Sequence, residues 1–472
     1  MKILMPVHFF LPEHSAGTEV YTYNLARALT ELGHEVEVFC TEKILSRRSY
    51  SMLERDVDGI KCHVMVNNLD HESFAETFAN PRAEGAFQRV LDKFKPDVVH
   101  VQHLMLLSLG LPRLSRAAGA RVVMTLNDFW LFCVRFGQLL LPDGTLCSGP
   151  NLQDCASCLQ DFQFSQGKPE KLMIRLLQVT RELSGVDLAP VVYWAQDRSQ
   201  YLKKRKTKTA SKSAKAGASE DLIDELKHRI RKVQLLVEQV DLFLSPSNTV
   251  AERMAEWGIP RNKVRVSRYG IDTTPFENLP RSEPPEEEDE ERKITFGYVG
   301  TLAPHKGVHV LLGAMRQLPE EACRLHIYGS DKHFGDYGRV LRDMAEGRDI
   351  VFCGPLDRSR IGEAFETIDC LIMPSIWLEN SPVVIQEAFA AHVPVIASGQ
   401  GGMAELIQDG RSGRLFPAGD VDALAEHMLA VLQNPTTLRT WSVSMDPPRS
   451  IQDDASGMQE IYAELLALNN GA

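Results

Sequence analysis

The stretch Trp377-Leu-Glu-Asn-Ser-Pro-Val-Val-Ile-Gln-Glu387 decides the fold of the second half of the chain. The apolar run 369–374 before it predicts a buried strand that ends at a proline, and 388–391 after it continues a helix. Ser381 is a favoured N-cap residue, and Pro382 suits the first helical position because its missing N–H costs nothing there. The stretch therefore predicts a strand, a loop and a helix in succession.

The start of this helix has the features of a site for an anion between two hydroxyl-bearing groups. The free amides of Val383 and Val384 would point out of the helix N-terminus, where a phosphate binds readily. Glu387 lies one turn beyond Val383 on the same side, and Glu379 lies in the loop before the helix. One carboxylate can bind a ribose diol and the other a second polyol. Carboxylates eight residues apart are also common by chance, so a solvated loop Glu and a helix-face Glu form the alternative.

Strands and helices alternate on both sides of this stretch. The chain opens with a strand at 2–7, a loop, a helix at 18–32 and a strand at 36–39. Further strands are expected at 97–102, 121–126, 241–245 and 263–267, with a helix between 105 and 118. A second series follows at 294–299, 324–328, 350–353, 369–373 and 393–397. This pattern predicts an α/β protein with two parallel, doubly wound sheets.

These motifs resemble glycosyltransferase family 4, the retaining sugar transferases with the GT-B fold of two Rossmann-like domains facing across a cleft. The Glu-x7-Glu spacing and the Glu-Asn-Ser-Pro wording at 379–382 carry the resemblance, which runs from Met1 to about residue 434. It implies that Glu387 binds the ribose, that Glu379 binds hydroxyls of the sugar, and that Ser381, Val383 and Val384 line the donor site.

The turn after the first strand of the second domain, Gly300-Thr-Leu-Ala-Pro-His-Lys306, completes the expected donor site. Lys306 could reach a diphosphate and neutralise the charge that grows on it as the sugar bond breaks. A surface lysine in a turn is the alternative. The family usually has Arg where this chain has Thr301. The loss of this cation would weaken donor binding, unless backbone amides or Arg268 supply the missing phosphate contacts.

The first domain is expected to supply the acceptor side. Gly17 permits close backbone approach in a loop that resembles the family's Gly-Gly turn, where amides face the donor phosphate. Asn127 and Asp128 follow a strand, and most family members have His in place of Asn127. The resemblance implies that this position contacts the transferred sugar, so Asn127 is a catalytic candidate with Glu379 and Lys306. Asn can donate and accept hydrogen bonds there, but it cannot titrate, which puts a proton-handling role in question. His103, at the end of the preceding strand, is a candidate for the acceptor side or a structural histidine.

The sequence contains two kinds of candidate metal-binding motif. The Asp-x-Asp strings at 56–58 and 420–422 are expected to serve a turn and a helix cap, so no catalytic metal is predicted. Four cysteines fall in one Gly/Pro-rich region, and only the last two have the Cys-x2-Cys spacing typical of zinc: Cys133, Cys147, Cys155 and Cys158. A structural zinc site and four unlinked reduced thiols both remain open.

Composition restricts the classes of partner and the cellular location that we expect for this protein. The net charge of −11 argues against nucleic acid as the main partner. No apolar run approaches the roughly 20 residues of a membrane span, the N-terminus lacks a cleavage site, and nine cysteines fit a reducing cytoplasm. The basic tract Lys203–Lys215 is either a solvated insertion or an attraction to an anionic membrane, which would place the protein peripherally on the inner face.

The resulting prediction is a metal-independent retaining hexosyltransferase for polysaccharide biosynthesis. Its donor would be a nucleotide diphosphate-sugar and its acceptor a glycan or a lipid-linked glycan. A catalytically inactive partner subunit on the same fold is the alternative, and a nucleotide-sugar epimerase ranks third. Expected boundaries are 1–274 for the first domain, with the cysteine loop 133–158 and the basic insertion 203–218, then an acidic linker 275–293, a second domain 294–434, and 435–472 crossing back to the first domain.

Overall fold

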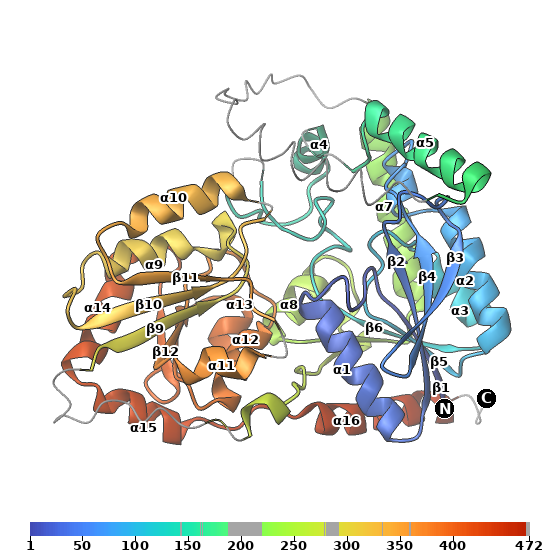
Figure 1. The fold of residues 1–472 in the computed structure, drawn as a ribbon. Coiled ribbons are helices and arrows are strands. Elements are labelled where there is room, and N and C mark those ends of the chain that lie inside the picture. Colours follow the sequence, from blue (N-terminus) through green and yellow to red (C-terminus); the bar gives the residue numbers. More distant parts are fainter. Residues whose placement is uncertain are drawn as a thin grey trace. The chain divides into compact units, whose positions relative to one another are not determined.

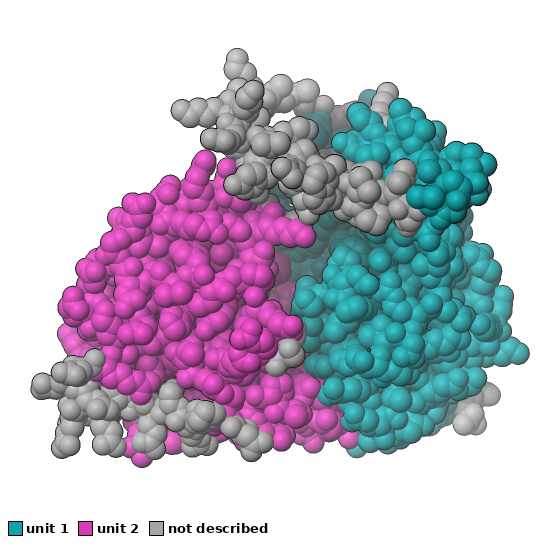
Figure 2. All heavy atoms as spheres, in the orientation of Figure 1, with its two compact units in different colours: residues 1–244, 257–263, 459–472 teal, residues 245–256, 264–458 magenta. Residues whose placement is uncertain are grey.

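The computed structural model describes residues 1–141, 144–160, 162, 164–186, 220–277, 279, 292–332, 334–357 and 360–468. The chain divides into two compact units, coloured separately in Figure 2: residues 1–244, 257–263 and 459–472 form the first unit, and residues 245–256 and 264–458 form the second. The basic insertion at 203–218 and most of the acidic linker at 275–293 lie outside the described residues.

The first unit is built on a parallel sheet. Six of its strands pair in parallel in the order β4-β2-β1-β5-β6-β7, and β3 is added antiparallel to β4. The strands are β1 (Lys2–Pro6), β2 (Glu35–Glu42), β3 (Met52–Val57), β4 (Ile60–Val66), β5 (Val98–Val101), β6 (Arg121–Thr125) and β7 (Leu242–Ser245). The central strand β1 is a continuous apolar run because helices cover both faces of the sheet (Figure 1).

Helices of the first unit follow most of these strands. They are α1 (Gly17–Glu31), α2 (Pro81–Phe94), α3 (Leu111–Ala117), α4 (Leu152–Gln160), α5 (Lys168–Ser184) and α7 (Glu220–Gln239). The helix predicted over 105–118 is wrong in its first half, since α3 begins only at Leu111. Leu106 adopts a left-handed φ of 62°, and its carbonyl accepts a 2.9 Å hydrogen bond from the buried Asn67 side chain, so this segment is a loop tied to the core.

The second unit contains a six-stranded parallel sheet in the order β11-β10-β9-β12-β13-β14. Its strands are β9 (Ile294–Val299), β10 (Cys323–Tyr328), β11 (Ile350–Gly354), β12 (Cys370–Met373), β13 (Val395–Ser398) and β14 (Gly413–Phe416). Counted along the chain, this order is 3-2-1-4-5-6, the arrangement of the doubly wound dinucleotide-binding fold. The prediction of two Rossmann-like sheets is confirmed.

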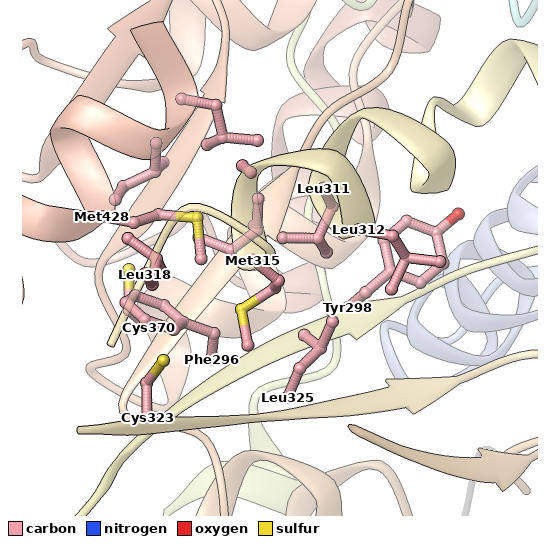
Figure 3. Close-up of a cluster of buried hydrophobic side chains, with 14 of the residues drawn as sticks. Phe296, Tyr298, Leu311, Leu312, Met315, Leu318, Cys323, Leu325, Cys370 and Met428 are labelled. Carbon is pink, nitrogen blue, oxygen red and sulfur yellow. The ribbon is translucent and has the colours of Figure 1, made fainter. Parts of the chain in front are cut away.

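Helices cover both faces of this second sheet (Figure 1). They are α9 (Val308–Met315), α10 (Gly335–Ala345), α11 (Ile361–Glu366), α12 (Val383–Ala390), α13 (Gly401–Leu406), α14 (Val421–Gln433) and α15 (Thr436–Ser444). The unit also includes α8 (Asn248–Glu256) and β8 (Val264–Val266). One core cluster packs α9 and α14 on the sheet, as Figure 3 shows for residues such as Phe296, Leu311 and Met428, and a second packs α11, α12 and α13 on the opposite face.

The last helix, α16 (Ile451–Ala467), ends the described chain. Residues 459 onward belong to the first unit, where the Tyr462 hydroxyl lies 2.6 Å from Nδ1 of His100 in β5. None of the helices in the described ranges is both long enough and apolar enough to cross a membrane.

Candidate functional site

The order of the second sheet places its topological switch point between β9 and β12. Helices and loops that follow these two neighbouring strands leave the sheet in opposite directions, and ligands bind at this switch point beyond the carboxyl ends of the strands. The turn 300–306 follows β9, and the loop 374–382 follows β12. The expected donor residues of both segments therefore lie at one edge of one sheet.

Lys306 and Glu379 meet at this edge. Lys306 Nζ donates to Glu379 Oε1 at 2.6 Å and lies 4.9 Å from the centre of the Trp377 ring. The carbonyl of His305 accepts hydrogen bonds from the amides of Ile376 and Trp377 at 3.0 and 3.2 Å, which fixes one loop against the other. Glu379 is 5% exposed, whereas the Lys306 side chain is 23% exposed, so the carboxylate is enclosed and the ammonium group is partly open to solvent. Two residues 73 positions apart in the sequence thus form one charged pair.

Glycines allow this close packing of the two loops. Gly307 adopts a φ of 71°, and a Cβ there would lie 1.9 Å from the carbonyl oxygen of Pro374. A Cβ on Gly402 would lie 1.9 Å from the carbonyl oxygen of Asn380, and the Gly402 amide donates to the Glu379 carbonyl at 2.7 Å. The backbone around Glu379 is therefore held from two sides.

Helix α12 begins one residue later than predicted. Pro382 is the N-cap, with a ψ of 115°, and no side chain caps the helix. The prediction that Ser381 caps the helix is wrong: the extended Pro382 carries Ser381 out of capping position, and its buried Oγ makes no hydrogen bond. Val383 and Val384 do form the first turn, whose amides have no acceptors within a helix. A buried hydroxyl and two amides are thus left at one helix end.

Three buried polar atoms near this end make no hydrogen bond: Ser381 Oγ, Gln386 Nε2 and Ser398 Oγ. Because a buried polar group without a partner costs free energy, such a cluster indicates a place where a ligand supplies the missing bonds. Glu387, one turn into α12, is 3% exposed. Sequence reasoning missed Gln386 and Ser398, although Ser398 ends a strand, β13, at the same edge.

Electrostatics at the site favour a neutral His305. Burial, and to a smaller extent the adjacent Lys306 ammonium, lowers the pKa of His305 to about 4. Burial, and to a smaller extent the Glu379 carboxylate, raises the pKa of the Tyr298 hydroxyl well above its usual range. His305 and Tyr298 are therefore neutral at neutral pH. His305 was not predicted, because its burial depends on packing between two distant loops.

The remaining donor-side candidates lie around the same turn. Gly300 follows β9, and the exposed Thr301 accepts a 2.9 Å hydrogen bond at its carbonyl from the Tyr298 hydroxyl. Arg268, considered as a substitute cation for the missing Arg, donates to the Glu405 carbonyl in α13 at 3.4 Å. The turn is thus anchored by backbone contacts, with Lys306 as its paired cation.

A separate polar cluster lies at the carboxyl edge of the first sheet. His103 Nε2 and Asp128 Oδ2 are 3.0 Å apart, and His103 Nδ1 accepts the Met105 amide, so Nε2 carries the proton and donates to the carboxylate. His8 and Glu19, which sequence reasoning missed, lie beside this pair. The His8 ring centre is 4.4 Å from that of His103, and His8 Nε2 is 3.3 Å from Glu19 Oε1.

Burial controls the ionisation of this cluster. It lowers the pKa of His8, with help from the neighbouring His103 and His14, and it raises the pKa of Glu19. His8 Nδ1 and Glu19 Oε2 are buried without hydrogen-bond partners, as is Gln102 Nε2. These atoms follow β1 and β5 or lie in the first turn of α1, so they face the same edge as His103 and Asp128.

Asn127 and Gly17 flank the cluster. Asn127 Nδ2 donates to the Gln102 carbonyl at 2.7 Å, which ties the ends of β5 and β6 together. Gly17 starts α1, and a Cβ there would meet nothing within 4 Å. The space in front of the first turn of α1 is therefore open.

The structure bears on both kinds of candidate metal motif, the Asp-x-Asp string at 420–422 and the four cysteines. Asp420 caps α14, accepting from the amides of Asp422 and Ala423 at 3.1 and 3.0 Å, which confirms its structural role. In the part of the chain that is described, no group of three or more His, Cys, Asp or Glu side chains is arranged to hold a metal ion as it stands. The zinc interpretation of the four cysteines finds no preformed ligand set.

Sequence profiles of two families match the chain. The profile of glycosyl transferases group 1 matches residues 281–443, and that of the glycosyl transferase 4-like domain matches residues 16–149. The two matches fall on the two sheets, and the first contains both Lys306 and Glu379. The chain belongs to glycosyltransferase family 4.

Individual family 4 relatives agree with this assignment. A putative colanic acid biosynthesis glycosyltransferase, WcaL, of Escherichia coli is 32% identical over 219 residues, covering 44% of this chain and 52% of the relative. A GDP-mannose-dependent alpha-mannosyltransferase of Mycobacterium tuberculosis is 32% identical over 185 residues, covering 39% and 45%. The chain spans about half the length of the curated relatives that it matches.

Solved structures share the GT-B fold of family 4 over the whole chain. Sucrose-phosphate synthase from Thermosynechococcus elongatus has a TM-score of 0.63 at 16% identity and 99% coverage of both chains. HepE from Anabaena, solved in complex with UDP-glucose, has a TM-score of 0.59 at 14% identity and 100% coverage of both. At such low identity these likenesses establish the fold.

Proposed function

We propose that this family 4 protein transfers a hexose from a nucleotide diphosphate-sugar to a glycan or a lipid-linked glycan, with retention of configuration. The observation that carries the proposal is the Lys306–Glu379 pair, 2.6 Å apart, in the loops beside the start of α12. A cation beside helix amides is suited to a diphosphate that gains charge as the sugar bond breaks.

Each donor residue has a role in this proposal. Lys306 and the amides of Val383 and Val384 bind the diphosphate, and Ser381 Oγ, which has no protein partner, adds a further hydrogen bond. Glu379 binds hydroxyls of the sugar and orients Lys306 through their ion pair. Glu387 binds the ribose.

Retention follows from attack on the face that the diphosphate leaves. The departing phosphate oxygen takes the proton of the acceptor hydroxyl, so the protein needs no nucleophile and no metal ion in this proposal. The acceptor side consists of His103 and Asp128, with Gly17 and Asn127 at its borders. A membrane-surface role for the basic tract Lys203–Lys215 remains a prediction from composition.

The test is sugar transfer from a panel of UDP-, GDP- and ADP-sugars, followed by NMR of the product's anomeric proton. We expect one donor to react with retention, and Lys306→Ala to reduce the rate at least tenfold, since charge-assisted contacts contribute about 1.5–3 kcal/mol. Lys293→Ala is the matched control, because Lys293 pairs with Asp349 at 3.1 Å before the amino end of β9. Full activity of Lys306→Ala would refute the assigned donor site.

The competing hypothesis is a catalytically inactive partner subunit that binds nucleotide-sugar. It is motivated by Thr301 and Asn127, which replace the Arg and His usual in the family. It predicts that a nucleotide stabilises the protein while neither transfer nor donor hydrolysis occurs with any acceptor. That combination of results would replace the enzymatic proposal while leaving the donor site intact.

A further inference from the structure

Four cysteines converge on one pocket in the first unit. Cys133, Cys147, Cys155 and Cys158 all line it, although they come from three different segments of the chain. All four are free thiols, two of them buried. The proposed sugar transfer uses none of them, so their convergence needs a separate explanation.

The chain reverses direction between the first two cysteines, Cys133 and Cys147. Leu140 and Leu146 form an antiparallel bridge, and the Cys147 amide donates to the Leu139 carbonyl at 2.8 Å. The Leu139 amide in turn donates to Cys133 Sγ at 3.4 Å. An amide that points at sulfur stabilises the thiolate form, which is the form that binds metals.

Helix α4 carries the other two cysteines. Cys155 and Cys158 are three residues apart, so they lie on one face of the helix, toward the pocket. The Asn151 side chain accepts hydrogen bonds from the amides of Gln153 and Asp154 at 2.9 and 3.2 Å, which fixes the start of this helix. Two local structures therefore present two thiols each to the same space.

Two arginines supply positive charge around these thiols. Arg135 lines the pocket, and its Nε and Nη1 are buried without a hydrogen-bond partner. Arg229 is 4% exposed and donates to the Leu131 carbonyl at 2.7 Å. Burial lowers the pKa of Arg229 to about 10, with Cys133 and Cys155 acting to raise it, so the guanidinium stays charged at neutral pH.

We propose that Cys133, Cys147, Cys155 and Cys158 bind one structural zinc ion. Four thiolates around Zn²⁺ form the closed tetrahedral set of structural sites, with Zn–S distances of about 2.3 Å. Such a centre has a net charge of −2, which the guanidinium groups of Arg135 and Arg229 balance. The sulfurs must turn inward onto the ion, since no three described ligands are already arranged around a common point.

Zinc binding at this site is coupled to protons. Since the thiolate is the form that binds zinc, each S–H group releases its proton to solvent as its Zn–S bond forms, and no oxidant or reductant is needed. The apparent zinc affinity should consequently rise with pH.

Metal analysis of the full chain, purified in reducing buffer and incubated with Zn²⁺, tests this site independently of sugar transfer. We expect one zinc per chain by elemental mass spectrometry, and loss of that zinc in the double variant Cys155→Ser/Cys158→Ser. Cys353→Ser, which changes an exposed cysteine in β11, should keep the full zinc content.

A second measurement decides the case if the double variant does not fold. Co²⁺ added to the wild-type chain should produce thiolate-to-cobalt charge-transfer absorption and the visible bands of tetrahedral coordination, and Zn²⁺ should abolish both. Absence of zinc with four thiols reactive to a thiol reagent, a Cys155–Cys158 disulfide, or iron in place of zinc would each overturn the proposal.

Discussion

His100 shows how a single buried residue can make the stability of the fold depend on pH. It is fully buried in β5, with Nδ1 2.6 Å from the Tyr462 hydroxyl and Nε2 2.8 Å from Thr125 Oγ1. Burial lowers the pKa of His100 to about 3. Because the folded pKa lies below the unfolded value of about 6.5, the unfolded chain binds the proton first as the pH falls.

We expect His100 to reduce the free energy of unfolding between about pH 6.5 and pH 3, by about 1.4 kcal/mol per pH unit. His100→Gln, which keeps hydrogen-bonding groups but cannot titrate, should flatten this part of the profile. Denaturant unfolding at several pH values measures the difference. Parallel profiles for the wild type and the variant would contradict this account.

Sequence reasoning found the site residues that follow simple strand-end rules. Lys306 and Glu379 were predicted because each follows a strand and matches a motif of glycosyltransferase family 4, and the structure brings them together. His305, Ser398, His8 and Glu19 were missed because their significance comes from burial without full hydrogen bonding. Burial depends on which distant segments pack together, which local sequence patterns do not report.

Two glycines, in the loop after β9 and within α2, should respond in opposite ways to an added methyl group. Gly307→Ala places a Cβ 1.9 Å from the Pro374 carbonyl and requires a left-handed φ of 71°. Gly85→Ala lies inside α2, where a Cβ would meet nothing within 4 Å. The first change should destabilise the second unit by about 1–3 kcal/mol from backbone strain alone.

Gly85→Ala should instead stabilise the first unit by up to about 1 kcal/mol, because alanine has the higher helix propensity. Denaturant unfolding of both variants measures these changes, and nucleotide binding by Gly307→Ala reports whether the loop still positions Lys306. A stable, fully binding Gly307→Ala would show that the loops can separate without loss of the site.

At the level of elements, strands with a regular apolar pattern were predicted from the sequence, and a charged strand at the edge of a sheet was not. Most of the parallel strands were predicted from their apolar runs, but β4 and β14 were missed. The antiparallel strand β3 was not predicted either, since Glu54, Arg55 and Asp56 give it a polar character. The start of α12 was misplaced by one residue because Pro382 adopts an extended ψ of 115°.

At the scale of the whole molecule, two sheets that share the same order of six parallel strands have different polar groups at their edges. The second has a cation, a carboxylate and a helix N-terminus at its carboxyl edge, and the first has paired histidines and carboxylates at the corresponding edge. The alternation of strands and helices predicted two doubly wound parallel sheets, but the order of the strands was not predicted. The choice of nucleotide was not predicted either, since it depends on loops outside the regular pattern of strands and helices.

A ligand that binds only the folded second unit stabilises that unit by mass action. We therefore expect UDP, GDP or ADP at 100 times its Kd to stabilise it by about 2.7 kcal/mol. Thermal unfolding with each nucleotide identifies the preferred base. A shift that survives Lys306→Ala and Ser381→Ala together would place the nucleotide elsewhere.

The most direct test of the donor site is calorimetric titration of the preferred nucleoside diphosphate into the wild type, Lys306→Ala and the control Lys293→Ala. Because Lys306→Ala leaves the buried Glu379 carboxylate unpaired, Lys306→Ala/Glu379→Gln is included to separate binding from stability. We predict a loss of at least tenfold in affinity for both Lys306 variants and none for Lys293→Ala. Equal affinity across all four proteins would contradict the assignment of Lys306 to the diphosphate.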